Sequence, residues 1–461
     1  MPTYTPHTED EISDMLAFLG LASLDQLFEA VPEAIRLVGE LAIPRGRPEP
    51  DVYARIQQAA ARNRPCGKDL VCFAGGGAYD HEVPAAVRAL ASRSEFVTSY
   101  TPYQPEVAQG VLQALFEFQT MVAALTDLEI SNASLYDGAA ALTEAVNLAA
   151  SATGRSEVWV SAGVRPTWRE VISTFSRGTG HVIREIPLDD GLTCWPSASD
   201  EAGHPAPGRS EDHAPGPAAL VVSYPNHLGC LEDLSAVRAL CDATGALMIA
   251  AFDPIASGVL RSPGSWGADI AVGEGQAVGM PLSFGGPYLG LFACSPASVR
   301  RMPGRLVGET LDVEGRVAYV TTLRAREQDI RREKASSNVC TNQTLMALTA
   351  AIQLAWLGPA GIAEVAIRSA RATRHLRDLL LAIDGVEPLA GAPTLYEFSI
   401  RTPADPELLV ERLADEGFLA GLPLDPYASG GLGEGLLLCA TERRTRQEIE
   451  AFATAFAKAL G

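Results

Sequence analysis

The chain has 461 residues, enough for two or three domains with sizeable hydrophobic cores. Its composition, 47% hydrophobic and 20% charged, is typical of a folded protein and argues against global disorder. The formal net charge of −20 argues against binding to nucleic acid or to an anionic membrane surface, because both require concentrated Lys and Arg.

The cysteines and histidines give no support for a metal site. The eight cysteines are scattered without a C-x-x-C pair, which is typical of reduced, mostly buried thiols, and the seven histidines form no H-x-x-x-H pair. No apolar run reaches the roughly 20 residues that span a bilayer. Residues 1–11 are acidic and lack an apolar signal core. We therefore predict a cytoplasmic protein without a metal or a membrane segment.

The first 65 residues are predicted to be a helical segment. Thr8 and Glu11 form a capping box before apolar residues at helical spacing, and Gly20 follows as a stop. Ser23 and Gln26 repeat this pattern. Further on, residues 69–73 resemble a strand that leads into three glycines, and a helix is expected to start at Pro105.

From residue 131 onward, short apolar runs alternate with amphipathic stretches. Strands are expected at 157–160, 181–186, 218–223, 246–252, 269–272 and 288–293, and helices near 138–150, 166–176 and 233–243. This alternation predicts an α/β fold, with a large, mostly parallel sheet covered by helices on both faces, over residues 66–330. Residues 194–217 are predicted to be a solvent loop.

A smaller C-terminal α/β domain is predicted over residues 331–461. Its helices are expected near 342–357, 360–382, 406–415 and 446–459, and its strands near 396–400 and 436–439.

Residues 246–287 are typical of the cofactor segment of a pyridoxal-phosphate (PLP) enzyme. A strand ends in Asp253, and a polar turn follows at 273–276. Such enzymes hold PLP as a Schiff base, which needs a primary amine. The only lysines in the chain are Lys68, Lys334 and Lys458, all outside this segment. We therefore predict a PLP-enzyme scaffold that lacks its own cofactor anchor.

Two further features fit such a scaffold, and each has a plainer alternative. Asp253 could pair with a pyridinium nitrogen, or it could simply form a turn before Pro254. The helix start at Tyr136 and Gly138 could bind a phosphate through backbone N–H groups and the helix dipole. Alternatively, it could be an ordinary helix start capped by Asp137 or by Ser134.

Three other polar groups are candidates for function. The segment 98–106 contains Tyr100, Tyr103 and Gln104 just before a helix, where an anionic group could dock or a subunit interface could pack. The Asp80-His81-Glu82 run is more typical of a helix cap than of a catalytic histidine. The arginines between 324 and 332 alternate with acids, which indicates a solvated charged segment, although one could face a carboxylate substrate.

Motifs along almost the whole chain match one family. They are the runs at 73–81, 100–106, 133–138, 273–276 and 281–287, and the run at 331–334 before 340–343. With these motifs the chain resembles the P-protein family of the glycine cleavage system, glycine dehydrogenase (decarboxylating). The resemblance is to subunit 1 of the two-subunit bacterial form.

The resemblance implies PLP-dependent transferase fold type I, with the cofactor lysine on a paralogous subunit 2. When Gly286-Pro287 is placed on the family's Gly-Pro ending, Gln276 falls at the lysine position. The chain would then bind no PLP covalently and be inactive alone. It would complete the partner's PLP site for decarboxylation of glycine and transfer of the aminomethyl group to the lipoylated H-protein, in an α2β2 heterotetramer.

Site residues follow from the same resemblance. Tyr100, Tyr103 and Gln104 are expected to contribute to the partner's catalytic site, and Thr341 and Asn342 to face its PLP phosphate. Asp253, Tyr136 and Gly138 are expected to line the chain's own vestigial pocket. The segment from Arg324 to Asp329 departs from the family pattern, so no role is assigned to either residue.

Two alternatives remain open at the level of sequence. The chain could be a self-sufficient PLP enzyme that uses Lys334 or Lys68 as its anchor. It could also be a purely structural pseudoenzyme that only stabilises its partner.

Overall fold

The computed structural model describes residues 6–37, 39, 41–98, 102, 104–197, 216–425 and 432–461. Tyr100, Tyr103 and most of the predicted 194–217 loop lie outside these described residues. The chain divides into two compact units, Met1–Asn63 (the N-terminal unit) and Arg64–Gly461 (the main unit).

The N-terminal unit consists of short helices. The predicted capping box is confirmed: helix α1 (Glu9–Leu19) starts with reciprocal bonds between Thr8 and Glu11 and stops at Gly20 with φ 70°. It is followed by 3₁₀ turns η1 (Leu24–Phe28) and η2 (Glu33–Ile35), and by helix α2 (Glu49–Ala60). The second predicted cap is wrong, because the Ser23 side chain makes no capping bond. None of the unit's described residues is buried.

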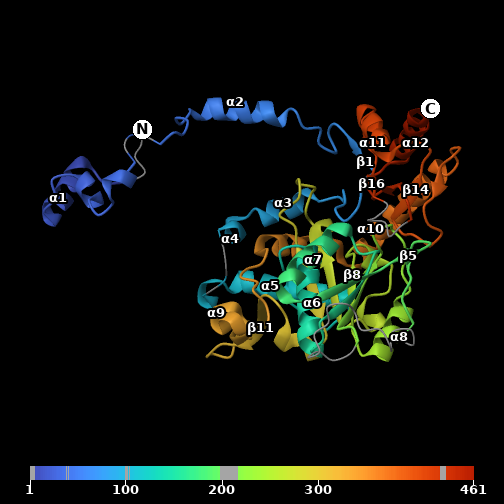
Figure 1. Ribbon diagram of the computed structural model, residues 1–461, viewed down its shortest axis with the longest axis horizontal. Coiled ribbons are helices and arrows are strands. Elements are labelled where there is room, and N and C mark those ends of the chain that lie inside the picture. Colours follow the sequence, from blue (N-terminus) through green and yellow to red (C-terminus); the bar gives the residue numbers. More distant parts are fainter. Residues whose placement is uncertain are drawn as a thin grey trace. The chain divides into compact units, whose positions relative to one another are not determined.

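The main unit is organised around a seven-stranded sheet (Figure 1). Its order is β2 (Ile130–Ser131), β10 (Gly290–Cys294), β9 (Ile270–Glu274), β8 (Leu247–Phe252), β7 (Ala219–Tyr224), β3 (Glu157–Ser161) and β4 (Val182–Ile186). The five strands from β9 to β4 are parallel, and β10 is antiparallel to both of its neighbours. The predicted mostly parallel sheet is confirmed.

Helices cover both faces of this sheet, as predicted. Alternate side chains of one strand point to opposite faces, and Val158 and Val160 of β3 pack in one core cluster with α6 (Gly138–Thr153) and α7 (Pro166–Thr179). Trp159 between them packs in another cluster with α8 (Leu234–Thr244). The strands are buried on both faces, which explains their continuous apolar runs.

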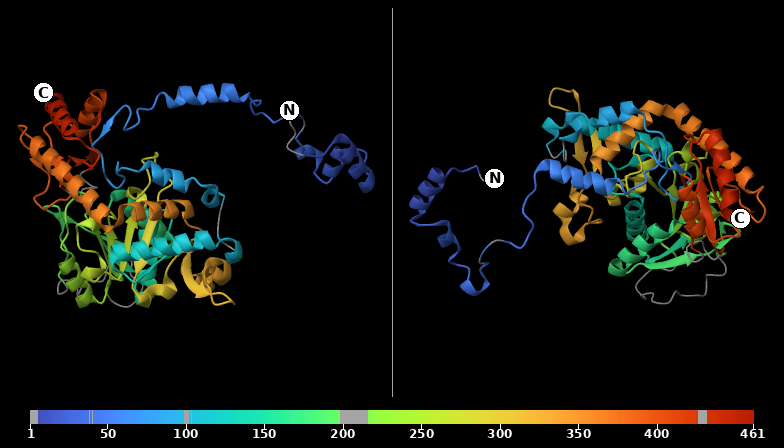
Figure 2. Two further views of the ribbon diagram at one scale, coloured as in Figure 1. Left: turned by 180° about the vertical axis from the view of Figure 1, so that it is seen from behind. Right: turned by 90° about the horizontal axis from the view of Figure 1, so that it is seen from above.

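A long helix, α10 (Thr344–Leu380), links the two cores of the main unit. Leu348 packs with α5 (Gln109–Thr126) against the large sheet, and Leu376 packs in the C-terminal core. Figure 2 shows the orange helix α10 running toward the red C-terminal elements. The sequence predicts two helices here, and Gly358 (φ 59°) before Pro359 does break the helical geometry between them. By length and composition α10 could span a membrane, but 44% of its most apolar window is buried, as in a core helix.

The C-terminal sheet is antiparallel, in the order β13 (Glu387–Pro388), β14 (Glu397–Arg401), β17 (Gly435–Cys439) and β16 (Leu422–Leu424). Helices α11 (Pro406–Asp415) and α12 (Arg446–Leu460) pack on it. Strand β1 (Val71–Cys72) pairs in parallel with β15 (Phe418–Leu419), and the next residue, Phe73, stacks on Phe452 at 4.2 Å. The domain division at residue 330 stays a prediction.

Shorter elements complete the main unit. They are α3 (Ala85–Ala91), α4 (Ser94–Val97), η3 (Pro105–Val107), β5 (Leu188–Asp189), β6 (Leu192–Thr193), η4 (Ala256–Gly258), η5 (Gly264–Trp266), η6 (Gly275–Ala277), η7 (Pro296–Arg301), β11 (Leu306–Leu311), β12 (Val317–Thr322), η8 (Arg324–Arg326), α9 (Gln328–Arg331) and η9 (Arg332–Lys334).

The predicted helix cap at Asp80-His81-Glu82 is wrong. Helix α3 follows Pro84, and no side chain caps it. Instead, Asp80 accepts hydrogen bonds from Arg443 and from Arg444, and His81 Nδ1 lies 2.7 Å from Glu442 Oε2. The run therefore joins the start of the main unit to the loop after β17, because burial of these charges requires opposite partners.

Candidate functional site

The predicted vestigial pocket lies where β7, β8 and β9 end. Ligands of open α/β sheets bind at these carboxyl ends, and Asp253 and Glu274 occupy them. The lining residues are Gly77, Tyr79, Arg165, Trp168, Ser223, Pro225, Ala251, Phe252, Asp253 and Glu274. The remaining cavity is only about 10 Å³, which holds about one water molecule.

Asp253 forms the turn that follows β8. Its Oδ1 accepts hydrogen bonds from the backbone N–H groups of Ile255 (2.8 Å) and Ala256 (2.9 Å), so the turn interpretation is confirmed. The side chain is buried and contributes negative charge to the pocket. Pairing of Asp253 with a pyridinium nitrogen stays a prediction.

The start of α6 is already occupied by side chains of this chain. Asp137 Oδ1 accepts a hydrogen bond from Ala140 N at 2.7 Å, which confirms the helix-cap interpretation with Asp137 as the cap. The N–H of Gly138, the group predicted to bind a phosphate, donates to Glu274 Oε2 at 2.9 Å.

Glu274 is held by three backbone donors. Besides Gly138, the N–H groups of Gln276 and Leu289 both donate to its Oε1 at 3.0 Å. Burial raises the pKa of Glu274 to about 7, and these backbone donors oppose the shift. The carboxylate therefore takes up the anion-binding capacity of the helix start.

Gln276, at the position the resemblance assigns to the cofactor lysine, is fully buried. Its Oε1 accepts from Tyr79 N at 2.8 Å, and its Nε2 donates to the carbonyls of Tyr79 (3.0 Å) and Met280 (2.8 Å). Both ends of the amide are thus engaged with backbone groups. An amide in this environment is a structural clamp and cannot form an imine.

A buried network of hydrogen-bonded side chains, which the sequence did not reveal, lies beside Gln276. Arg165 Nη2 donates to the Tyr79 hydroxyl at 3.1 Å, and that hydroxyl donates to Glu397 Oε2 at 2.9 Å. Glu397 belongs to β14 and also accepts from the N–H of Gly76. Burial lowers the pKa of Arg165, but Tyr79, Glu397, Asp253 and Glu274 raise it more, so the guanidinium stays charged.

The residues of this pocket do not fit PLP. Pockets for ligands of cofactor size have volumes of about 300–1,000 Å³, far above the 10 Å³ found here. The helix start is taken by a carboxylate, and no amine lies in the pocket. The three lysines, Lys68, Lys334 and Lys458, are all exposed.

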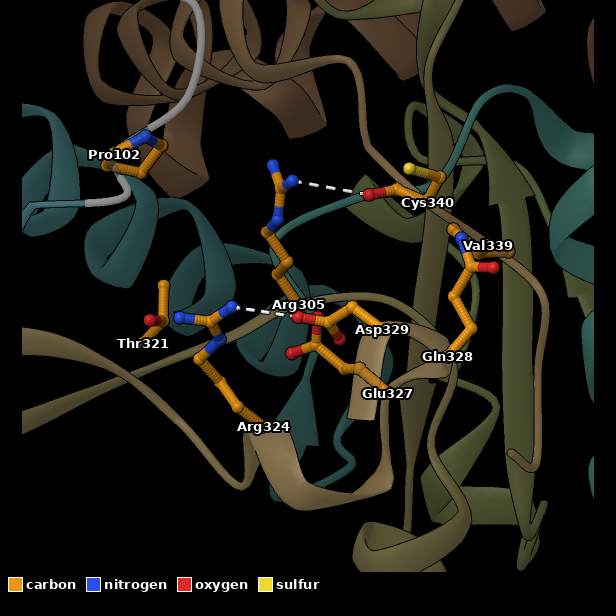
Figure 3. Close-up of a pocket in the computed structure, with 9 residues that line it drawn as sticks. All are labelled: Pro102, Arg305, Thr321, Arg324, Glu327, Gln328, Asp329, Val339 and Cys340. Carbon is orange, nitrogen blue, oxygen red and sulfur yellow. Dashed lines mark hydrogen bonds and ion pairs between the residues drawn. The ribbon is translucent and has the colours of Figure 1, made fainter. Parts of the chain in front are cut away.

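A second, open pocket of about 70 Å³ lies next to the 340–342 segment (Figure 3). It is lined by Pro102, Arg305, Thr321, Arg324, Glu327, Gln328, Asp329, Val339 and Cys340. Arg305 donates to Asn342 Oδ1 and to the Cys340 carbonyl, both at 3.2 Å. Arg324 faces Asp329 at 3.1 Å. Two guanidinium groups thus reach one pocket from separate segments.

Within the part of the chain that the structure describes, sequence neighbours of the predicted partner-facing residues, and not those residues themselves, line the second pocket. Pro102, from the aromatic segment, and Cys340, which precedes Thr341, line the same pocket, and Thr341 is half-buried. Gln104 is exposed. Tyr136 lies with this second group as well, because its hydroxyl accepts from Cys340 N at 3.3 Å.

Asn342 is buried, and its side chain is already satisfied within the chain. Nδ2 donates to the Ala133 carbonyl (2.7 Å) and the Ser134 hydroxyl (3.1 Å), and Oδ1 accepts from Arg305 and from Thr344. Both N–H groups of the amide are used. Asn342 therefore positions the segment, and no donor of its amide remains for an external phosphate.

Comparisons with known proteins agree with this architecture. Two relatives named probable glycine dehydrogenase (decarboxylating) subunit 1, from Desulforamulus reducens and Moorella thermoacetica, are each 44% identical over 98% of both chains. A crystal structure of glycine decarboxylase (P-protein) of the glycine cleavage system, in inhibitor-bound form, is 46% identical, with a TM-score of 0.89 over 99% of this chain and 100% of that one.

More distant structures share the fold alone. The sphingosine-1-phosphate lyase of Burkholderia pseudomallei superposes with a TM-score of 0.64 at 16% identity, over 93% of this chain and 94% of that chain. The predicted fold type I of PLP-dependent transferases is confirmed. Residues 2–456 match the family described as glycine cleavage system P-protein. The chain therefore belongs to the glycine cleavage system P-protein family.

Proposed function

We propose that this chain is the cofactor-free subunit of glycine dehydrogenase (aminomethyl-transferring), and that it completes the PLP site of a subunit 2 partner. Its relatives are named subunit 1 of that enzyme, which implies a second subunit. PLP on the partner would supply the electron sink for loss of CO2 from glycine. This chain would contribute residues that bind and orient the substrate at that site. The lipoylated H-protein would accept the aminomethyl group.

The observation that carries the proposal is the environment of Gln276. The side chain is fully buried, and both ends of its amide are bonded to backbone groups. With no amine and a cavity of only about 10 Å³, the chain's own pocket offers neither an anchor nor space for PLP. These observations support a catalytic cofactor that comes from another chain.

The contribution to the partner's site is assigned to the surface around the second pocket. Arg305 and Arg324 line that pocket together with Pro102, and Thr341 directly follows Cys340, which also lines it. Guanidinium and hydroxyl groups are donors suited to a phosphate or a carboxylate. Thr341 is retained as the residue that faces the partner's phosphate, and Asn342 and Tyr136 hold its segment in place.

The exposed apolar side chains of the N-terminal unit support an assembly. Phe18, Ile35 and Ile43 are 89%, 75% and 70% exposed, and large apolar side chains left exposed in one region are expected at protein–protein contacts. We propose an α2β2 heterotetramer with subunit 2, located in the cytoplasm.

The first test is borohydride reduction of the purified chain with PLP and glycine, followed by intact mass and peptide mapping. We expect no specific adduct on the chain alone and an adduct on subunit 2 in the reconstituted complex. A stable adduct mapped to Lys68 or Lys334 would instead show a self-sufficient enzyme, although both lysines are exposed.

The second test separates site completion from a purely structural role. Tyr103→Phe and Thr341→Ala should leave the complex assembled and lower its glycine decarboxylation rate at least tenfold. Thr310→Ala, at an exposed position of β11, is the matched control and should change nothing. Wild-type rates in both test variants would leave the chain with a structural role only.

A further inference from the structure

We infer that Arg165, Trp168 and Glu274 act as a built-in replacement for the cofactor. They fill the chain's vestigial pocket, so that it accepts neither PLP nor another phosphate ester even when an amine is supplied. This inference rests on the proposed function, because it explains how a cofactor-free subunit keeps the fold of a cofactor-binding one.

Glu274 replaces the phosphate. Its carboxylate takes the Gly138 N–H at the start of α6, together with the N–H groups of Gln276 and Leu289. A phosphate ester would have to displace these three bonds and then lie against a buried carboxylate. With a pKa of about 7, Glu274 is mostly ionised only above neutral pH, and there the repulsion of two anions at such a short separation disfavours this.

Arg165 and Trp168 replace the bulk of the cofactor, and two glycines make room for them. A Cβ atom on Gly77 would lie 2.0 Å from Arg165 Nη1 and 2.3 Å from its Cζ. A Cβ atom on Gly138 would lie 2.2 Å from Trp168 Cζ2. Since real Cβ contacts are never this short, the guanidinium and the indole press directly on the glycine backbones, in space that a side chain would otherwise need.

The inserted groups are also matched in charge and shape. The Arg165 guanidinium lies 5.4 Å from the centre of the Trp168 ring and 5.9 Å from that of Tyr79, both within the range of cation–π attraction. Asp253, Glu274 and Glu397 surround it with negative charge and raise its pKa. A buried acidic cluster needs such a cation, which a protonated cofactor ring would supply in a cofactor-binding relative of the fold.

The decisive experiment restores the lysine with and without the filling residues. Q276K and the triple variant Q276K/R165A/E274A are incubated with PLP and reduced with borohydride, and labelled peptides are mapped. We expect at least tenfold more labelling at position 276 in the triple variant than in Q276K. The three natural lysines, all exposed, report non-specific labelling in both samples.

Two results would reject the inference. Q276K labelled as fully as the triple variant would show that the filling residues are no barrier. A triple variant that keeps the wild-type near-UV circular dichroism spectrum but stays unlabelled at 276 would show that Arg165 and Glu274 are not the groups that exclude the cofactor.

A measurement on the wild-type chain covers the case in which the triple variant does not fold. Trp168 is the tryptophan in the lining of this pocket, and comparison with Trp168→Phe isolates its fluorescence from that of the other four tryptophans. Titration with inorganic phosphate or PLP should produce no saturable change in fluorescence or melting temperature, and a saturable change would reject the inference. Activity of the wild-type complex with subunit 2 is measured separately, so failure of the proposed function is distinguishable from failure of this inference.

Discussion

The N-terminal unit and the main unit both start a helix with a capping box, but only the helix of the main unit becomes buried. Thr8 and Glu11 at α1 and Thr445 and Glu448 at α12 form capping boxes of nearly identical geometry, with threonine N–H to glutamate distances of 2.7 Å in both. Yet α12 buries Phe452 and Phe456 completely, and α1 buries nothing. Local sequence signals decide where a helix starts, and only burial decides whether it contributes to a core.

The same contrast explains why the two units need different partners for their apolar residues. Fully buried phenylalanines of the main unit, such as Phe118 and Phe452, pack in its own core clusters, whereas Phe18 and Phe28 of the N-terminal unit are exposed. If these exposed residues pack against another chain, as proposed, their burial would contribute free energy to that association.

The largest expected effect contrasts two phenylalanines. Phe118 of α5 is fully buried and Phe18 of α1 is 89% exposed. Phe118→Ala should lower the free energy of unfolding by about 4 kcal/mol, because it leaves a cavity, while Phe18→Ala should change it by less than about 0.5 kcal/mol. Urea unfolding of the isolated chain measures both, and equal losses would break the comparison.

Phe18→Ala should show its effect only in the complex. If the N-terminal unit binds subunit 2, the substitution is expected to weaken assembly about tenfold, as for a well-packed interface residue. Analytical ultracentrifugation of the mixed subunits at several concentrations measures the change. Assembly unaffected by Phe18→Ala would place the contact elsewhere.

The next largest effect on stability is expected from substitution of Gln276, whose amide is hydrogen-bonded to backbone groups at both ends. Gln276→Leu leaves two backbone groups of Tyr79 and the carbonyl of Met280 without their partner, which should cost about 3 kcal/mol of stability. Gln113→Leu is the matched control on the exposed side of α5 and should be near neutral. Equal urea midpoints for the two variants would contradict a clamp.

The stability of the main unit should fall in mild acid because of His227. Burial, with Arg165 and Arg169 nearby, lowers the pKa of His227 from 6.5 to about 3. Below pH 6.5 the unfolded chain therefore binds a proton that the folded chain does not, and stability present at pH 7 is lost as the pH falls toward 3.

His227→Gln removes this dependence. The wild type should lose about 2 kcal/mol more stability than the variant between pH 7 and pH 5. Denaturant unfolding of both chains at each pH gives the difference, in which the other titrating groups cancel. Parallel pH profiles would show that His227 titrates alike in the folded and unfolded chains.

The smallest effect compares the two capping boxes directly. Thr445→Ala should lower the global free energy of unfolding by about 1 kcal/mol, and Thr8→Ala should speed local amide exchange in α1 while leaving the global value unchanged. Hydrogen exchange by mass spectrometry resolves the two. A global loss from Thr8→Ala would show that the N-terminal unit shares in the main core.

Much of the architecture can be predicted from the periodicity of apolar residues in the sequence, but the candidate site can be predicted only in part. The parallel strands and their helices are predictable because each carries its own apolar pattern, and Asp137 carries an ordinary capping signal. Arg165 and Glu397 carry no such local signal. They are linked through the Tyr79 hydroxyl, and this contact forms only when segments hundreds of residues apart fold together. Gln276 stands out only through the absence of lysine, and two of the three hydrogen bonds of its amide are made with Tyr79, far away in the sequence.

The pairing of β1 with β15 also orders events during synthesis of the chain. Val71 and Cys72 leave the ribosome long before their strand partners, Phe418 and Leu419. Strand β1 therefore has no strand partner until residue 419 has emerged. A nascent chain that ends before residue 418 would expose an unpaired strand edge, which is prone to aggregation.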